Sequence, residues 1–209
     1  MKAPAIYETF AKRFFKPAEM RGNMVISFNW DLLMERSLHD AAVPWDYNPR
    51  FPGATPVLKP HGSINWSSWL EGGGHCDYGG WRAIAPQSKL SFDVTQPFVD
   101  PDVDEINPDY RYMLFPGDPE LPEQNANLKL IWSDVQTALE QSEALAFIGY
   151  SFPQYDPYSA EIFRRYGVGR QIEVYNPSVE HLQHFRRQLG DHVELFAQKF
   201  EECPYAQVS

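Results

Sequence analysis

The stretch that decides the fold is VISFNWDLLMERSL, residues 25–38. It begins with a short, mostly apolar run that is too continuous for a strand with one wet face. The run predicts a strand covered on both faces, as in a parallel sheet. The helix predicted after it has an apolar side made of Leu32, Leu33, Leu38 and Ala42. Between strand and helix lies the polar turn Asn29-Trp30-Asp31, which either caps the helix or presents polar groups to a ligand.

The remainder of the chain alternates between the same two kinds of pattern. Further strands are predicted at residues 56–63, 143–152, 171–178 and 192–197, and helices at residues 5–16, 123–142, 157–167 and 178–190. This alternation predicts the α/β class, with a Rossmann-like open, mostly parallel sheet and helices on both faces. A segment at about residues 67–123, rich in Pro, Asp and aromatic residues, predicts a long ordered loop or lid. The length of 209 residues suits a single domain, residues 1–209.

The composition argues against several classes of protein. A net charge of −10 opposes the binding of nucleic-acid phosphates, so no nucleic-acid partner is expected. The two cysteines, Cys76 and Cys203, are too few for a four-thiolate zinc site and suggest no disulfide framework. We therefore expect no metal and a reducing cytoplasm. No apolar run approaches the ~20 residues that cross a bilayer, so no membrane partner is expected either.

Polar or small residues follow four of the predicted strands. They are Asn29 and Asp31, the triplet His61-Gly62-Ser63, the triplet Gly149-Tyr150-Ser151, and Asn176. In an open α/β sheet, ligands bind in the crevice beyond the carboxyl ends of the strands. If the fold prediction holds, these four strand ends converge on one candidate site.

Four segments taken in order carry a resemblance to a known family. VISFNWDLLMERSL, LKPHGSINW, LAFIGYSF and IEVYNPS resemble the sirtuin-like superfamily, and most closely its zinc-lacking bacterial branch of NAD-cleaving defence domains. The resemblance covers residues 23–178. It implies that NAD is the ligand and that Asn29 and His61 are the catalytic pair, with Asp31 at the nicotinamide end. It further implies nucleotide contacts by Ser63, Gly149, Ser151, Phe152 and Asn176.

Two features of the family are missing from this sequence. With two cysteines the chain cannot build the four-cysteine zinc module of sirtuin deacylases, so protein deacylation is not expected. The family also begins with a strand and a glycine-rich turn whose backbone N–H groups cradle the pyrophosphate, and no such segment precedes residue 25. We therefore expect a sheet that lacks its first strand, with an open side that invites a second copy or a partner chain.

The residues at the strand ends suit cleavage of the nicotinamide–ribose bond. The leaving group is already a cationic pyridinium, so one base and good positioning suffice. His61 is the expected base, because histidine titrates near neutral pH. Asn29 is expected to orient water or the carboxamide, and Asp31 to stabilise positive charge developing on the sugar. The sequence thus predicts an NAD glycohydrolase.

Each of these residues also has an ordinary structural role. Asp31 is a good N-cap, Asn29 is a frequent turn former, and His61 suits a packed loop. Gly149 allows the strand-to-helix turn whatever the function, and Asn176 before Pro177 is a common turn pair. The alternative function is therefore a catalytically inactive module that senses NAD or ADP-ribose, or that serves in assembly.

Overall fold

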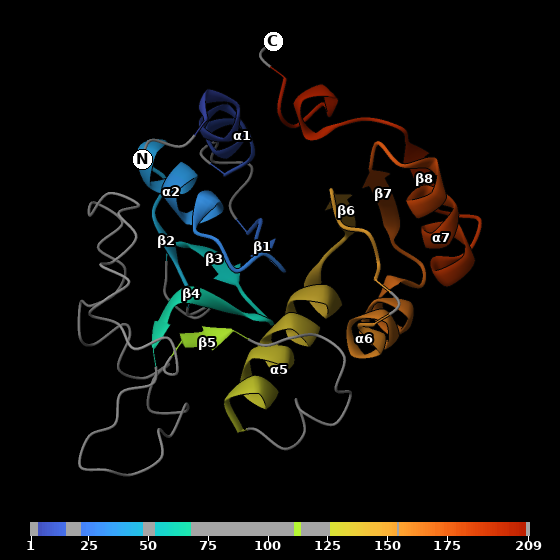
Figure 1. Ribbon diagram of the computed structural model, residues 1–209, viewed down its shortest axis with the longest axis horizontal. Coiled ribbons are helices and arrows are strands. Elements are labelled where there is room, and N and C mark those ends of the chain that lie inside the picture. Colours follow the sequence, from blue (N-terminus) through green and yellow to red (C-terminus); the bar gives the residue numbers. More distant parts are fainter. Residues whose placement is uncertain are drawn as a thin grey trace. The chain divides into compact units, whose positions relative to one another are not determined.

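The computed structural model describes residues 4–15, 22–47, 53–67, 111–113, 126–153 and 155–207. These residues belong to two units (Figure 1). Unit 1 lies within Met1–Phe115 and Leu121–Asp134, and unit 2 lies within Pro116–Glu120 and Val135–Ser209. Most of the loop or lid expected at about residues 67–123 lies outside the described residues.

Unit 1 is built on a small parallel sheet. Its strands are β1 (Val25–Ile26), β2 (Trp45–Asp46) and β3 (Thr55–Leu58), in the order β1-β3-β2. The helices α1 (Ala5–Phe15) and α2 (Leu33–Asp40) contact each other. The central strand β3 is the best buried of the three, with Val57 and Leu58 at most 1% exposed. This burial fits a parallel sheet, whose inner strands are covered on both faces.

A second, antiparallel pair extends unit 1. The strand β4 (Gly62–Ser67) pairs with β5 (Arg111–Met113). Sequence patterns predict a loop or small local hairpin after residue 63, whereas residues 64–67 continue as a strand whose partner lies more than forty residues downstream. Local patterns do not reveal such a distant partner, because register depends on the tertiary context.

Unit 2 contains a three-stranded parallel sheet with helical connections. Its elements are β6 (Ala144–Ile148), α6 (Pro157–Gly167), β7 (Gln171–Tyr175), α7 (Val179–Leu189), β8 (Glu194–Phe196) and the 3-10 helix η3 (Phe200–Glu202). The helix α5 (Ala126–Gln141) leads into β6, and the boundary between the units falls within it. The strand order β6-β7-β8 follows the sequence, so each crossover joins neighbouring strands. Figure 1 shows this alternation in yellow to red.

Local signals explain where the helices of unit 2 begin and end. Asp156 caps α6 by accepting a hydrogen bond from the Ser159 N–H at 3.1 Å, and Pro157 occupies the first turn. Ser178 caps α7 by accepting from the His181 N–H at 3.3 Å. Gly190 follows α7 with φ +101°, a conformation that glycine adopts at little cost. The helices predicted at 157–167 and 178–190 are therefore confirmed.

The two helices α6 and α7 pack on one face of the unit 2 sheet. The ring of Phe147 on β6 lies 4.9 Å from that of Phe163 on α6 and 5.1 Å from that of Phe185 on α7. On the opposite face, the Tyr175 ring stacks on Phe196 and meets Tyr205 from the C-terminal segment edge-on. Among the described residues, α6 and α7 therefore cover one face of this sheet, and aromatic residues of β7, β8 and the C-terminal segment pack together on the other.

The described chain mixes helices with small parallel sheets, which agrees with the α/β class. Among the helices of the described ranges, none has the length and apolar character that a membrane span requires.

Candidate functional site

The predicted catalytic pair follows two hydrogen-bonded parallel strands. Val25 and Ile26 of β1 align with Val57 and Leu58 of β3, and the Ser27 N–H continues the ladder by donating to the Leu58 carbonyl at 2.8 Å. Because the strands run parallel, the turns that follow them emerge at the same edge of the sheet. The structure therefore brings together two of the four segments expected at strand ends, residues 29–31 and 61–63. The expected strand 56–63 is divided, however, because β3 ends at Leu58 and Gly62 and Ser63 already belong to β4.

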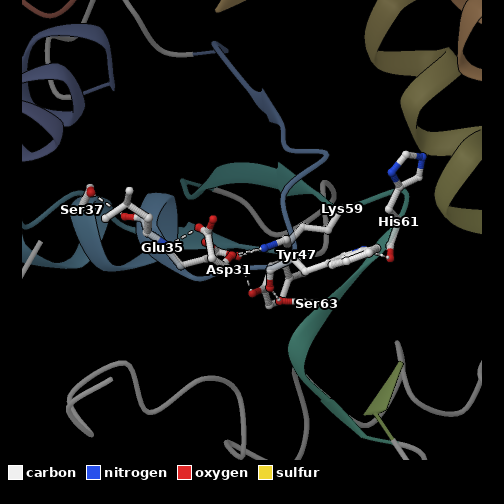
Figure 2. A network of polar contacts seen from close by, with 9 residues as sticks. Asp31, Glu35, Ser37, Tyr47, Lys59, His61 and Ser63 are labelled. Atoms are coloured by element: carbon white, nitrogen blue, oxygen red, sulfur yellow. Dashed lines mark hydrogen bonds and ion pairs between the residues drawn. The ribbon is translucent and has the colours of Figure 1, made fainter. Parts of the chain in front are cut away.

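Two hydrogen bonds, each from a side chain to a backbone carbonyl, join the Asn29–Asp31 turn to His61 and to Ser63 of β4. The Trp30 indole N–H donates to the His61 carbonyl at 3.0 Å, and the Ser63 hydroxyl donates to the Trp30 carbonyl at 3.3 Å (Figure 2). Ser63 is fully buried. Besides the nucleotide contact expected from the sequence, Ser63 thus has a structural role, because its hydroxyl binds the start of β4 to the Asn29–Asp31 turn.

Asp31 stabilises the start of α2 from one position earlier than expected. The N-cap position is held by Leu32, not by Asp31, and the Leu32 side chain forms no cap. Instead, the Asp31 carboxylate accepts a hydrogen bond from the Leu33 N–H through Oδ1 at 2.9 Å. This hydrogen bond supports the structural role of Asp31 at the start of α2, although Asp31 remains exposed to solvent.

Asn29 and His61 differ sharply in exposure. Asn29 is exposed, whereas His61 is 8% exposed. The imidazole meets the Phe28 ring edge-on at 5.0 Å and lies 6.5 Å from the Trp132 ring. In Figure 2 the His61 ring points away from the Asp31 carboxylate, although their turns are bonded to each other. At this edge of the sheet, Asn29 is therefore accessible from solvent, whereas the His61 side chain is largely covered.

A buried ionic network lies directly beneath the Asn29–Asp31 turn. The Lys59 ammonium is 3.0 Å from Oε1 of Glu35 and donates a hydrogen bond to the Asp31 carbonyl. The Tyr47 hydroxyl donates to the same Oε1 at 2.7 Å. Lys59 and Glu35 are at most 1% exposed and Tyr47 is 4% exposed. Figure 2 shows the Lys59 side chain reaching toward both Asp31 and Glu35.

Sequence reasoning missed this network, although two signals for it exist. Lys59 directly follows the apolar end of β3, two residues before His61, and Glu35 lies four residues after Asp31, between two leucines of α2. Charged residues are almost never fully buried unless they are paired. A lysine and a glutamate at two such positions are therefore candidates to form an ion pair with each other.

Unit 2 holds the remaining residues of the predicted site. Gly149 follows β6 with φ +69°, and a Cβ built there meets no atom of the described residues within 4 Å. Ser151 is partly buried. Phe152, expected to contact the nucleotide, is only 2% exposed, and its ring lies 4.9 Å from the Phe185 ring. Phe152 also adopts a positive φ of 54°, which is unusual for a residue with a bulky side chain.

The side chain of Asn176 joins the ends of two strands. Its amide nitrogen donates to the Tyr150 carbonyl at 3.0 Å, and its amide oxygen accepts from the Ser178 N–H at 2.9 Å. Its backbone N–H donates to the Phe196 carbonyl at 3.1 Å. Asn176 is 4% exposed, so its first effect is to fix the shape of the carboxyl edge of the unit 2 sheet.

Tyr150 remains protonated at this edge. Burial raises the pKa of Tyr150 far above its ordinary value, and the nearby Asp156 carboxylate raises it further. The hydroxyl therefore stays a neutral hydrogen-bonding group throughout the pH range in which proteins work.

Within the described ranges, no group of three or more His, Cys, Asp or Glu side chains is arranged to hold a metal ion. No model of a known protein family matches the chain, and no curated protein sequence matches it.

Proposed function

We propose that this protein binds NAD and hydrolyses its nicotinamide–ribose bond. The observation that carries the proposal is the joining of the Asn29 and His61 turns at the ends of two adjacent parallel strands. Fixed geometry between two polar groups is what a hydrolytic site needs, because holding the reactants in place lowers the barrier. The resemblance of the four sequence segments to NAD-cleaving sirtuin-like domains supports the same choice.

The proposed reaction consumes one water molecule. The bond from the ribose C1′ to the pyridinium nitrogen breaks, and its electron pair neutralises the departing nicotinamide. The water oxygen bonds to C1′, and His61 accepts the proton that the water loses. Asn29 orients the water or the carboxamide, while Asp31 stabilises the positive charge that develops on the sugar. The products are nicotinamide, ADP-ribose and a proton.

Gly149, Ser151 and Asn176, at the carboxyl edge of the unit 2 sheet, are proposed to contact a nucleotide. The open space beside Gly149 supports this role, since a ligand can approach the backbone closely there. We also propose the finer assignment of a Rossmann-like α/β fold. Parallel pairing within both three-stranded sheets, and the strand–helix–strand connections of unit 2, support that assignment.

A second candidate function is nucleotide sensing without turnover. The burial of His61 favours it, because a base with 8% exposure meets water or substrate only after its surroundings shift. Such a module binds NAD or ADP-ribose and leaves both intact.

Nicotinamide release from NAD by the purified chain tests the proposal. We expect release by the wild type, none by His61→Ala, and wild-type release by His192→Ala, which removes an exposed histidine of unit 2. No release at high protein concentration excludes hydrolysis. Thermal shifts with NAD and ADP-ribose then distinguish a nucleotide sensor from a protein that binds no nucleotide, because a ligand that binds the folded state raises its Tm. A shift without turnover identifies a sensor, and no shift excludes nucleotide binding.

A further inference from the structure

We infer that Lys59 and Glu35 form a buried anchor that fixes the Asn29–Asp31 turn for reaction. This inference rests on the proposed function for its catalytic meaning, but the anchoring itself is a property of the fold. Neither residue is expected to touch the substrate, because both are at most 1% exposed. They are positioning residues, acting through the turn above them.

The contacts of the Lys59 ammonium carry the inference. Its position is set by the Glu35 carboxylate, whose Oε1 lies 3.0 Å away and also accepts the Tyr47 hydroxyl. From that position the ammonium donates to the Asp31 carbonyl, inside the turn. A backbone carbonyl bound by a buried cation is held more firmly than one bound by water, since charge-assisted hydrogen bonds are the stronger ones.

The network is also an unusual use of buried charge. Oε2 of Glu35 is buried, and among the described residues it has no hydrogen-bond partner. Burying an ion pair has a large desolvation cost, and apolar residues of similar volume often stabilise a fold equally well. Stability alone therefore does not account for the pair. The contact from Lys59 to Asp31 is the part of the network that reaches the turn, and apolar side chains cannot reproduce it.

The turn is thereby held from two sides. Lys59 binds the Asp31 carbonyl from beneath, and Trp30 is bonded to the turn that carries His61. Loss of the first contact leaves the second in place, so the turn loosens at its Asp31 end without unfolding.

The test compares variants that differ in the anchor but keep the core filled. Lys59→Met alone leaves a buried carboxylate without its cation and threatens folding. The informative variant is therefore Glu35→Leu, Tyr47→Phe and Lys59→Met combined, which replaces the network with apolar side chains. Tyr47→Phe alone is the matched control, since it keeps the contacts of Lys59 with Glu35 and Asp31. Glu35→Gln is a milder variant that keeps the shape of the network and removes its negative charge.

Amide hydrogen exchange provides a readout that does not depend on NAD. We expect exchange at residues 29–33 to be about tenfold faster in the triple variant, and faster to a smaller degree in Glu35→Gln, with β3 and unit 2 unchanged. Tyr47→Phe should exchange like the wild type in this segment. Unchanged exchange at residues 29–33 in both anchor variants overturns the inference.

Kinetics give the catalytic readout. We expect kcat for nicotinamide release to fall about tenfold in the triple variant while KM changes little, because an anchor affects positioning more than binding. Activity that is unchanged, or that falls only with the folded fraction, overturns the positioning role. A wild type that releases no nicotinamide overturns the proposed function instead, and hydrogen exchange still decides whether the anchor exists.

Discussion

The indole of Trp30 donates a hydrogen bond to the backbone of His61, and the hydroxyl of Ser63 donates one back to the backbone of Trp30. This reciprocal pair joins the Asn29–Asp31 turn to the segment from His61 to Ser63, about thirty residues later in the sequence. Two such bonds in opposite directions oppose both the sliding of the two segments past each other and their separation. The candidate site is thus cross-linked by hydrogen bonds independently of the β ladder.

Trp30→Phe should lower the free energy of unfolding by about 1–2 kcal/mol, because it removes the N–H donor and leaves the His61 carbonyl without it. Ser63→Ala should lower it by about 1 kcal/mol, since its bond is longer. The double variant should show a coupling energy of about 0.5 kcal/mol or more in urea titrations. Strict additivity of the two losses would show that the bonds act separately.

Asp31→Asn separates the capping role of Asp31 from a role of its charge. Asparagine keeps an oxygen that accepts from the Leu33 N–H, so the urea midpoint should stay within about 0.5 kcal/mol of the wild type. We expect kcat for nicotinamide release to fall about tenfold, because the charge opposite the developing cation is lost. Asp31→Ala should lose about 1 kcal/mol of stability as well. An Asn variant with wild-type kcat would assign Asp31 to capping alone.

Gly149→Ala tests whether a ligand approaches the end of β6. In the part of the chain that the structure describes, the added methyl meets no atom within 4 Å, so its expected cost is the backbone strain at φ +69°, about 1–2 kcal/mol. Gly169→Ala is the matched control, with φ +79° and equally open space, but in the turn before β7. Calorimetric titration with ADP-ribose should show weaker binding for the first variant only. Equal affinities in both variants would place the ligand away from Gly149.

Arg170 joins the C-terminal ends of two helices in unit 2. Its guanidinium donates to the carbonyls of Ser142 and Glu140, after and within the last turn of α5, and to that of Tyr166 in α6. Arg170→Ala should lower the free energy of unfolding by about 2 kcal/mol, because free helix carbonyls lose a charged donor. Arg187→Ala, an exposed arginine of α7, should change it by less than about 0.5 kcal/mol. Equal urea midpoints for the two variants would refute this role.

The C-terminal segment should make the protein sensitive to alkali. Tyr175 and Tyr205 both donate to Oε2 of Glu173, at 2.8 and 2.6 Å. Burial raises the pKa of both phenols above the ordinary value, and the hydrogen bond to Glu173 raises it further. The folded protein keeps protons that the unfolded chain releases near pH ~10, so stability is complete below that pH and falls as pH rises above it.

Replacing both tyrosines with Phe should make this alkaline decline shallower. Urea titrations from about pH 8 to about pH 11 measure the slope for the wild type and for Tyr175→Phe with Tyr205→Phe. The variant is expected to be less stable at neutral pH because Glu173 loses two donors, but its slope should be smaller. A slope equal to that of the wild type would show that these phenols do not govern the decline.

Local sequence signals were sufficient to predict the helix boundaries of unit 2. Asp156 with Pro157, and Ser178 with Gly190, mark helix boundaries because each acts on backbone groups within a few residues. The same reasoning placed Asn29 and His61 at strand ends, since a short apolar run and the turn after it are both local. These predictions needed no knowledge of the partner strand.

What could not be predicted depends on contacts between distant segments. The pairing of β4 with β5 joins residues that no periodicity connects. The burial of Lys59 could not be foreseen from its charge, which ordinarily predicts exposure, because its partner Glu35 lies on a different element. The burial of Phe152 also could not be predicted from its neighbours in the sequence. Its positive φ is unusual for a bulky residue, and it accompanies packing of the ring against Phe185.

The proline that follows Asn176 affects how readily this asparagine deamidates. An asparagine loses its amide by ring closure when the nitrogen of the next residue attacks the side-chain carbonyl. Here the next residue is Pro177, which has no N–H to lose, so this route is blocked. Conversion to aspartate would replace the donor to the Tyr150 carbonyl with a second acceptor and part the ends of β6 and β7. The proline thus blocks the main route by which deamidation would break the hydrogen bond between Asn176 and Tyr150.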